Sequence, residues 1–144
     1  MDGNGLPLAA EVTAGQRHES TQFERVMDAV RVPRRVGRPR SRPRHVAGDK
    51  GYSYDRIRRW LRRRHIGAVI PQRTDQKQRH RGRPLTFDPD RYRRRNVVER
   101  CVGWLKECRA VATRFEKLAQ HYLGMVKMAL IQRYLRLLDS SYRA

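Results

Sequence analysis

Residues 92–106 read Tyr-Arg-Arg-Arg-Asn-Val-Val-Glu-Arg-Cys-Val-Gly-Trp-Leu-Lys, and this stretch decides how the chain folds. Its spacing predicts a helix, in which each residue advances by about 100° around the axis. Four polar side chains then share one narrow arc: Tyr92, Arg95, Glu99 and Lys106. The apolar side chains gather on the opposite face, namely Val97, Val98, Cys101, Trp104, Leu105, Cys108 and Ala112. One face can therefore be buried, while the other presents a single carboxylate among side chains that bind phosphate.

A second stretch places an acidic residue directly after a predicted strand. Residues 46–52 read Val-Ala-Gly-Asp-Lys-Gly-Tyr, and residues 45–47 have the composition of a short strand. Asp49 then lies in the turn after that strand, where α/β sheets place their functional groups.

The other expected elements complete an α/β pattern. In chain order they are a hairpin turn at 1–5, a strand at 6–13, a helix at 20–31, a basic helix at 54–65, a strand within 67–71, a helical region from 88 to about 113 and a packing helix at 117–138. The basic helix has an apolar stripe of Ile57, Trp60 and Leu61. His18, just before the first helix, is expected in a solvent-exposed loop rather than as a ligand.

The charge of the chain indicates a polyanionic partner. Lys and Arg number 34 against 14 Asp and Glu, a net charge of +20 in 144 residues. Such an excess is typical of proteins that bind nucleic acid. Arginine makes up 29 of the basic residues. Arginine suits two-pronged phosphate contacts, although codon bias in a GC-rich genome explains a preference for Arg over Lys equally well.

Two segments concentrate this charge. Residues 31–44, the basic linker, are too rich in Pro and Arg to form a packed element. They contain Gly37-Arg38-Pro39-Arg40, which looks like the core of an AT-hook that inserts Arg into a narrow minor groove; a general phosphate-binding loop is the favoured alternative. Residues 72–91 are predicted as a basic loop, with a second Gly-Arg-Pro at 82–84.

The spacing Tyr-x2-Arg-x3-Glu-x6-Lys, together with Gly-Asp-Lys-Gly-Tyr upstream, resembles the signature of bacterial insertion-sequence transposases of the DDE type, in the group similar to the IS-five and IS-four elements. The resemblance covers residues 2–138. It implies an RNase H-like fold and DNA transposition, with Asp49 and Glu99 as the second and third catalytic carboxylates. It also implies two Mg²⁺ or Mn²⁺ ions held by those carboxylates.

The resemblance implies further roles on the same helix. Arg95 and Lys106 would hold phosphate oxygens, and Tyr92 would position the DNA backbone or stack on an unpaired base. DNA, as element ends and target, is the expected partner, bound by an oligomer in the active complex. The expected compartment is cytoplasmic and nucleoid-associated, because no apolar run reaches the length of a membrane span.

The chain departs from the family pattern at its beginning. The family carries its first Asp on the opening strand of the sheet, and we expect that strand and much of the next to be missing here. Residues 1–144 are therefore expected to form one partial domain, the C-terminal part of a transposase, inactive alone. It would be a truncated remnant or a product completed by an upstream reading frame.

Three plainer readings stand beside these. Glu99 could form an ion pair with Arg95 one helical turn away, and Asp49 could serve only as a turn residue. The whole chain could be a non-catalytic basic nucleic-acid-binding protein. Cys101 and Cys108 have no zinc-binding spacing and are expected to be small apolar residues on the buried face.

Overall fold

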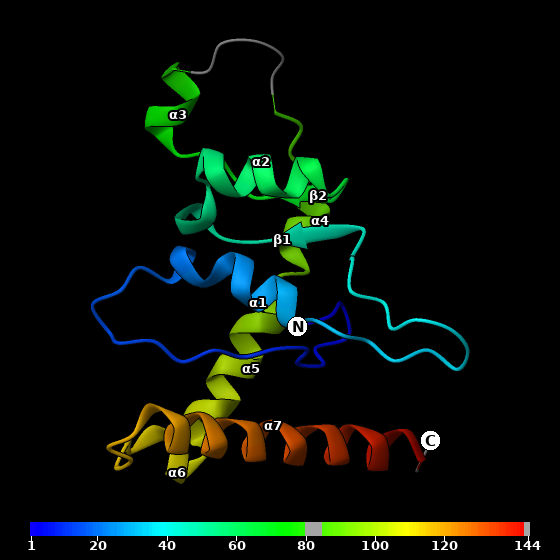
Figure 1. The fold of residues 1–144 in the computed structure, drawn as a ribbon, viewed down its shortest axis with the longest axis vertical. Coiled ribbons are helices and arrows are strands. Elements are labelled where there is room, and N and C mark those ends of the chain that lie inside the picture. Colours follow the sequence, from blue (N-terminus) through cyan, green and yellow to red (C-terminus); the bar gives the residue numbers. More distant parts are fainter. Residues whose placement is uncertain (80–84, 143–144) are drawn as a thin grey trace. The chain divides into compact units, whose positions relative to one another are not determined.

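The computed structural model describes residues 1–79 and 85–142, which form two compact units (Figure 1). One unit comprises residues 17–95 and is named here the α/β unit. The other comprises residues 1–16 and 96–144 and is named the helical unit. Each unit is described by itself.

The α/β unit contains the only β-sheet in the described residues, a two-stranded parallel sheet. Its strands pair in register from His45 opposite Gly67 to Ala47 opposite Val69, and helix α2 connects them. The elements in order are η1 (Glu19–Gln22), α1 (Phe23–Ala29), β1 (His45–Ala47), η2 (Lys50–Tyr52), α2 (Asp55–Arg63), β2 (Gly67–Val69), α3 (Thr74–Arg79) and α4 (Pro89–Arg93). The predicted strand–helix–strand order is confirmed for this part of the chain.

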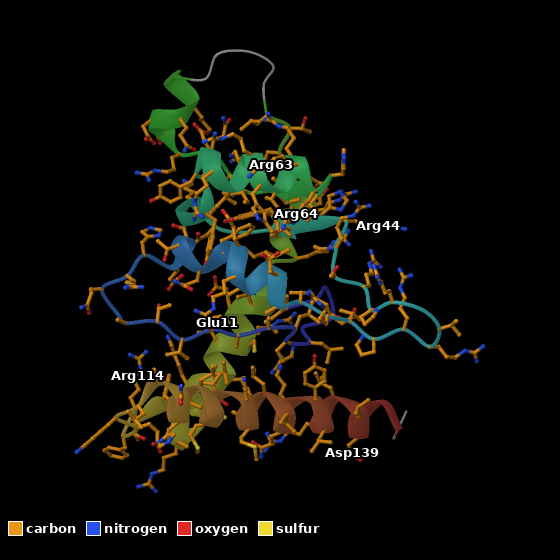
Figure 2. All side chains as sticks on the ribbon, viewed as in Figure 1. Glu11, Arg44, Arg63, Arg64, Arg114 and Asp139 are labelled. Atoms are coloured by element: carbon orange, nitrogen blue, oxygen red, sulfur yellow. The ribbon has the colours of Figure 1, made fainter. Side chains whose placement is uncertain are left out.

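Helix α2 separates an apolar face from a basic one. Arg64, just beyond its last turn, stacks on Trp60 at 3.9 Å and pairs with Asp28 at 3.3 Å. Arg63, in the last turn of the same helix, is exposed (Figure 2). Arg56 forms an ion pair with Glu24 at 2.7 Å, which fastens α2 to α1.

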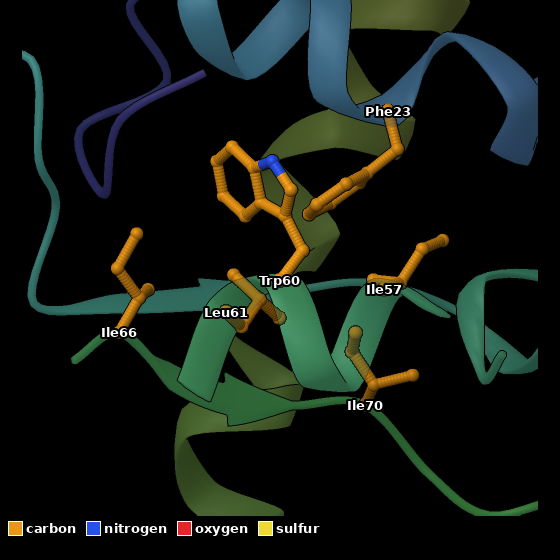
Figure 3. Close-up of a cluster of buried hydrophobic side chains, with 6 residues drawn as sticks. All are labelled: Phe23, Ile57, Trp60, Leu61, Ile66 and Ile70. Atoms are coloured by element: carbon orange, nitrogen blue, oxygen red, sulfur yellow. The ribbon is translucent and has the colours of Figure 1, made fainter. Parts of the chain in front are cut away.

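The core of the α/β unit lies between α1, α2 and the sheet (Figure 3). Ile57 and Leu61 are fully buried, and the ring of Trp60 meets that of Phe23 edge-on at 5.5 Å. The six buried members are Phe23, Ile57, Trp60, Leu61, Ile66 and Ile70. The predicted stripe of α2 is confirmed, because its 3–4 spacing places all three side chains on this face.

The helical unit consists of α5 (Asn96–Glu107), α6 (Arg109–Ala112) and α7 (Ala119–Tyr142). Val111, Val126 and Ala129 form its small buried cluster. The Tyr122 hydroxyl donates to the carbonyl of Val111 at 3.1 Å and joins α7 to α6. The final helix begins two residues later and ends four residues later than the predicted 117–138.

Three expectations about secondary structure are wrong. The segment 72–91 is not one irregular loop, because it contains helix α3 and the start of helix α4. Residues 6–13 form no strand, because no described strand lies beside them to complete a ladder. The Tyr134 hydroxyl of α7 instead donates to the carbonyl of Pro7. The helical region from 88 to 113 is broken into α4, α5 and α6. The chain leaves the helix after Arg93, and Cys108 adopts an extended conformation between α5 and α6.

Candidate functional site

Asp49 lies where strand β1 ends and the chain turns toward helix α2. Gly48 still donates to the carbonyl of Val69 at 3.3 Å, so the pairing with β2 extends to the residue before Asp49. Asp49 caps η2, with Oδ1 accepting a hydrogen bond from the Gly51 amide at 2.8 Å, and its side chain is exposed. A Cβ at Gly51 would lie 3.0 Å from that oxygen, so any larger residue at this position would crowd the carboxylate. The turn reading and the functional reading of Asp49 are thus compatible.

Tyr52 connects this turn to η1 and to the core of the α/β unit. Its hydroxyl donates to Glu19 at 3.5 Å, and its ring packs at 6.1 Å from Phe23. Burial, and then the negative charges of Glu19 and Asp49, raise the pKa of Tyr52 to about 12. The phenol therefore stays protonated at neutral pH and joins the Asp49 turn to η1. Sequence reasoning missed this contact, since the two side chains are 33 residues apart.

An open cleft of about 670 Å³ adjoins the Asp49 turn. It is lined by Lys50, Gly51, Arg73, Thr74 and Asp75. Buried Ser53, which follows η2, donates to Gln76 of α3 at 2.6 Å and so joins the two elements that supply the lining. The cleft lining thus contains two cations, Lys50 and Arg73, and Arg73 forms an ion pair with Asp75 of the same lining at 3.4 Å.

Glu99 and Lys106 lie on the exposed face of α5, as predicted, and Cys101 lies on its buried face with 3% of its surface exposed. Burial raises the pKa of the Cys101 thiol, which suits an inert apolar role. Cys108 is partly buried, and both cysteines are free. The predicted amphipathic pattern is confirmed within α5, but Ala112, predicted on the same apolar face, lies in the separate helix α6 and is exposed.

Tyr92 and Arg95 do not belong to this helix, so the single arc predicted for the four polar residues is wrong. Asp88 caps the separate helix α4 by accepting a hydrogen bond from the Arg91 amide, and this bond is the main cause of the lowered pKa of Asp88. The guanidinium of Arg95 lies 5.5 Å from the Tyr92 ring, within cation–π range. Tyr92 and Arg95 fall in the α/β unit, whereas Glu99 and Lys106 fall in the helical unit.

The predicted approach of Asp49 to Glu99 remains a prediction, because the two carboxylates also belong to different units. Across residues 1–79 and 85–142, no three His, Cys, Asp or Glu side chains come together as a metal-binding group. Carboxylate oxygens are the donors that Mg²⁺ prefers, so the donor type at Asp49 and Glu99 fits the implied ions, but each unit supplies only one of them.

The basic linker exposes both predicted phosphate-binding residues, Arg38 and Arg40. The second Gly-Arg-Pro, at 82–84, lies outside the described residues. His18 is exposed in the segment just before η1, as predicted; its Nδ1 caps η1 through Ser20, and its ring meets Tyr54 edge-on at 5.6 Å. No described helix is long and apolar enough to cross a membrane.

These features define a strongly basic domain in which a strand–helix–strand unit carries an exposed carboxylate at the strand end. The family model for the transposase DDE domain matches residues 1–132, and the chain belongs to that family. The family carries an RNase H-like fold, whereas the described residues are mainly helical with one two-stranded sheet.

A comparison with a related sequence supports the same family. The chain is 36% identical over 128 residues to a putative transposase for insertion sequence element IS402 of Burkholderia cepacia. The match covers 88% of this chain and 56% of the relative, in the C-terminal part of the latter. The chain thus spans little more than half the length of that relative. No solved structure matches the chain significantly.

Proposed function

We propose that this chain supplies the second and third catalytic carboxylates, Asp49 and Glu99, for metal-dependent cleavage and transfer of DNA strands during transposition. The observation that carries the proposal is the position of Asp49: its side chain is exposed just beyond the carboxyl end of a parallel strand, and its Oδ1 is fixed in the turn by the Gly51 amide. Glu99 contributes a second exposed carboxylate from the first turn of α5.

The residues around Asp49 and Glu99 have distinct tasks. Asp49 and Glu99 would hold Mg²⁺ or Mn²⁺, and such ions activate the attacking oxygen and stabilise the leaving one. Lys50 and Arg73 in the cleft, with Arg95 and Lys106, bind phosphate oxygens. Tyr92 offers an aromatic face to an unpaired base. Arg38 and Arg40 hold the DNA duplex outside the reacting centre.

We further propose that the chain does not cleave DNA alone. Two carboxylates hold two divalent ions weakly, because the ions repel each other and each needs several oxygen ligands. A further carboxylate has to come from a partner or from a region such as the remainder of the IS402 relative.

A fusion tests both statements. The part of the IS402 transposase that precedes the match is joined to this chain and incubated with Mg²⁺ or Mn²⁺ and duplexes carrying the element ends. We expect nicking by the fusion, none by the 144-residue chain, and none by fusions with Asp49→Asn or Glu99→Gln, which keep shape but lose charge. Glu107→Gln on the same helix α5 is the matched control and should nick normally. Nicking that survives Glu99→Gln would refute the assignment.

The alternative is a non-catalytic nucleic-acid-binding protein, and the net charge of +20 supports it, because this charge needs no catalytic centre to bind a polyanion. The same experiment separates the two functions. A fusion that binds element ends but nicks none of them with either metal supports the alternative.

A further inference from the structure

The basic linker between α1 and β1 is closed into a loop at its base (Figure 1). Val32 and Arg40 form an isolated antiparallel bridge, with amide-to-carbonyl distances of 2.9 and 2.8 Å. Gly37 has φ of +86°, a left-handed conformation that glycine adopts without strain and that turns the chain at the tip. The loop 33–39 is therefore a defined projection on the α/β unit.

The positive charge of the basic linker is not neutralised by acidic side chains in the described part of the same chain. Seven arginines and no acidic residue occur between Asp28 and Asp49. Within the described structure, five of the seven side chains make no hydrogen bond or ion pair: Arg34, Arg35, Arg38, Arg42 and Arg44. The other two bond only to nearby carbonyls: Arg31 to Asp28 and Val30, and Arg40 to Arg42. Their charge is left for an external polyanion.

The tip carries a feature that phosphate binding does not explain. Val36 is 81% exposed between Arg35 and Gly37, an apolar side chain at the most projecting part of a charged loop. An isopropyl group makes no hydrogen bond or ion pair with a phosphate, so phosphate binding does not account for Val36. Proteins that enter the DNA minor groove combine arginine with apolar side chains set against the base steps.

We propose that the basic linker is a minor-groove arm: its tip enters the groove with Arg38 along the floor and Val36 against the base edges, while Arg34, Arg35 and Arg42 contact the flanking phosphates. The minor groove is only about 6 Å wide, and the glycine at the turn keeps the tip narrow. A narrow, A·T-rich groove has the enhanced negative potential that attracts arginine. This inference rests on the proposed DNA-binding function and specifies its mode.

Three duplexes of equal length separate the possible modes of binding. They contain A·T, G·C or inosine·cytosine pairs at the centre. Inosine lacks the 2-amino group of guanine, so an inosine·cytosine pair resembles A·T in the minor groove and G·C in the major groove. The full chain is titrated with each duplex at one fixed salt concentration.

We expect the A·T and inosine·cytosine duplexes to bind alike, and the G·C duplex to bind about fivefold or more weakly, the low end of the discrimination that base contacts provide. Arg38→Ala and Val36→Gly should remove this preference. Arg38→Lys should keep the salt dependence but weaken the preference, because ammonium is more strongly hydrated than guanidinium. Arg63→Ala, which removes an exposed charge from α2, should weaken binding to all three duplexes equally and leave the preference intact.

The opposite results overturn the proposal. Equal affinities for all three duplexes mean phosphate contacts alone, and inosine·cytosine behaving like G·C means major-groove contact. Loss of the preference in Arg63→Ala as well means that no particular residue of the linker is responsible. The proposed catalytic function is judged separately, by nicking: a fusion that never nicks leaves the groove preference standing, whereas a chain that binds no duplex removes both.

Discussion

The two units of this protein differ most in what they expose. The α/β unit carries 25 Lys and Arg against 8 Asp and Glu, a net charge of +17, while the helical unit carries 9 against 6, a net charge of +3. Among the described residues, eight of the eleven exposed large hydrophobic side chains belong to the helical unit. One unit has a surface for a polyanion, and the other has a nearly neutral, partly apolar surface. From this contrast we expect residues 17–95 to supply the electrostatic part of the proposed DNA binding.

The largest expected effect tests this assignment directly. Replacing Arg34, Arg35, Arg38 and Arg42 with Ala should reduce the slope of log K against log salt by up to about 3.6, because each phosphate contact contributes about 0.9. Titration of one duplex at several salt concentrations measures the slope.

The matched control removes four exposed cations from the helical unit: Arg109, Lys117, Lys127 and Arg136. We expect its slope to stay close to that of the unchanged chain. Equal losses in the two variants would show that charge acts through its total rather than its location.

The next effect compares the two cores. Ile57→Ala removes a fully buried side chain and should lower the free energy of unfolding of the α/β unit by about 2–5 kcal/mol. Val126→Ala removes less apolar surface from the smaller core of the helical unit and should cost about 1–2 kcal/mol.

Each unit contains one tryptophan, Trp60 or Trp104, so fluorescence during urea unfolding follows the units separately in Trp104→Phe and Trp60→Phe backgrounds. Ile57→Ala should move the Trp60 transition and leave that of Trp104 in place. Two transitions that shift together would mean that the units unfold as one cooperative structure.

A smaller effect concerns the turn that carries Asp49. The pKa of Tyr52 is raised from its ordinary value near 10 to about 12, so the folded state holds the phenolic proton more tightly than the unfolded state. The stabilisation is complete below pH 10 and is lost as pH rises toward 12. We expect the free energy of unfolding to fall by on the order of 1–2 kcal/mol over this range. This is less than the change in pKa alone would give, because Tyr52 is only partly buried.

Urea unfolding followed by Trp60 fluorescence, at pH values from about 9 to about 12, checks this expectation. Tyr52→Phe should be less stable below pH 10 but should fall less steeply above it. Tyr134→Phe, in the helical unit, should keep the full decline of the Trp60 signal. The same decline in Tyr52→Phe would show that another group is responsible.

The smallest expected effect concerns the apolar surface of the helical unit. Ile131 and Leu135 of α7 are 51% and 61% exposed, and replacing both with Gln should change the free energy of unfolding by less than about 0.5 kcal/mol. Thermal or urea unfolding followed by Trp104 gives this value. A loss above about 1 kcal/mol would indicate that this face of α7 is covered in the folded chain.

Much of the α/β unit could be predicted from the sequence because its signals are local. The 3–4 spacing of Ile57, Trp60 and Leu61 depends only on helical geometry, and it correctly identified the face that became the core. The position of Asp49 after a strand followed from the short run at 45–47 and the glycines around it. These residues obey rules that operate within a turn or two of the chain.

The rest of the candidate site could not be predicted in the same way. A continuous amphipathic pattern from Tyr92 to Lys106 does not reveal that the helix stops after Arg93, since Arg94 and Arg95 are good helix formers. The strand expected at 6–13 required a neighbouring strand, and alternation alone does not provide one. The bond between Tyr52 and Glu19 joins residues far apart in sequence and has no local signal.

The sequence by itself determined the family, through two motifs with Asp49 and Glu99 at fixed spacing, and it determined the basic charge, because both are properties of composition and order. Only the tertiary structure decided that this charge is concentrated in one unit and that the basic linker closes through Val32 and Arg40. It also decided that Tyr92 and Arg95 lie outside the helix that carries Glu99 and Lys106. The physical reason is that unit boundaries, loop closure and burial depend on contacts between distant residues, whose free energy no local pattern contains.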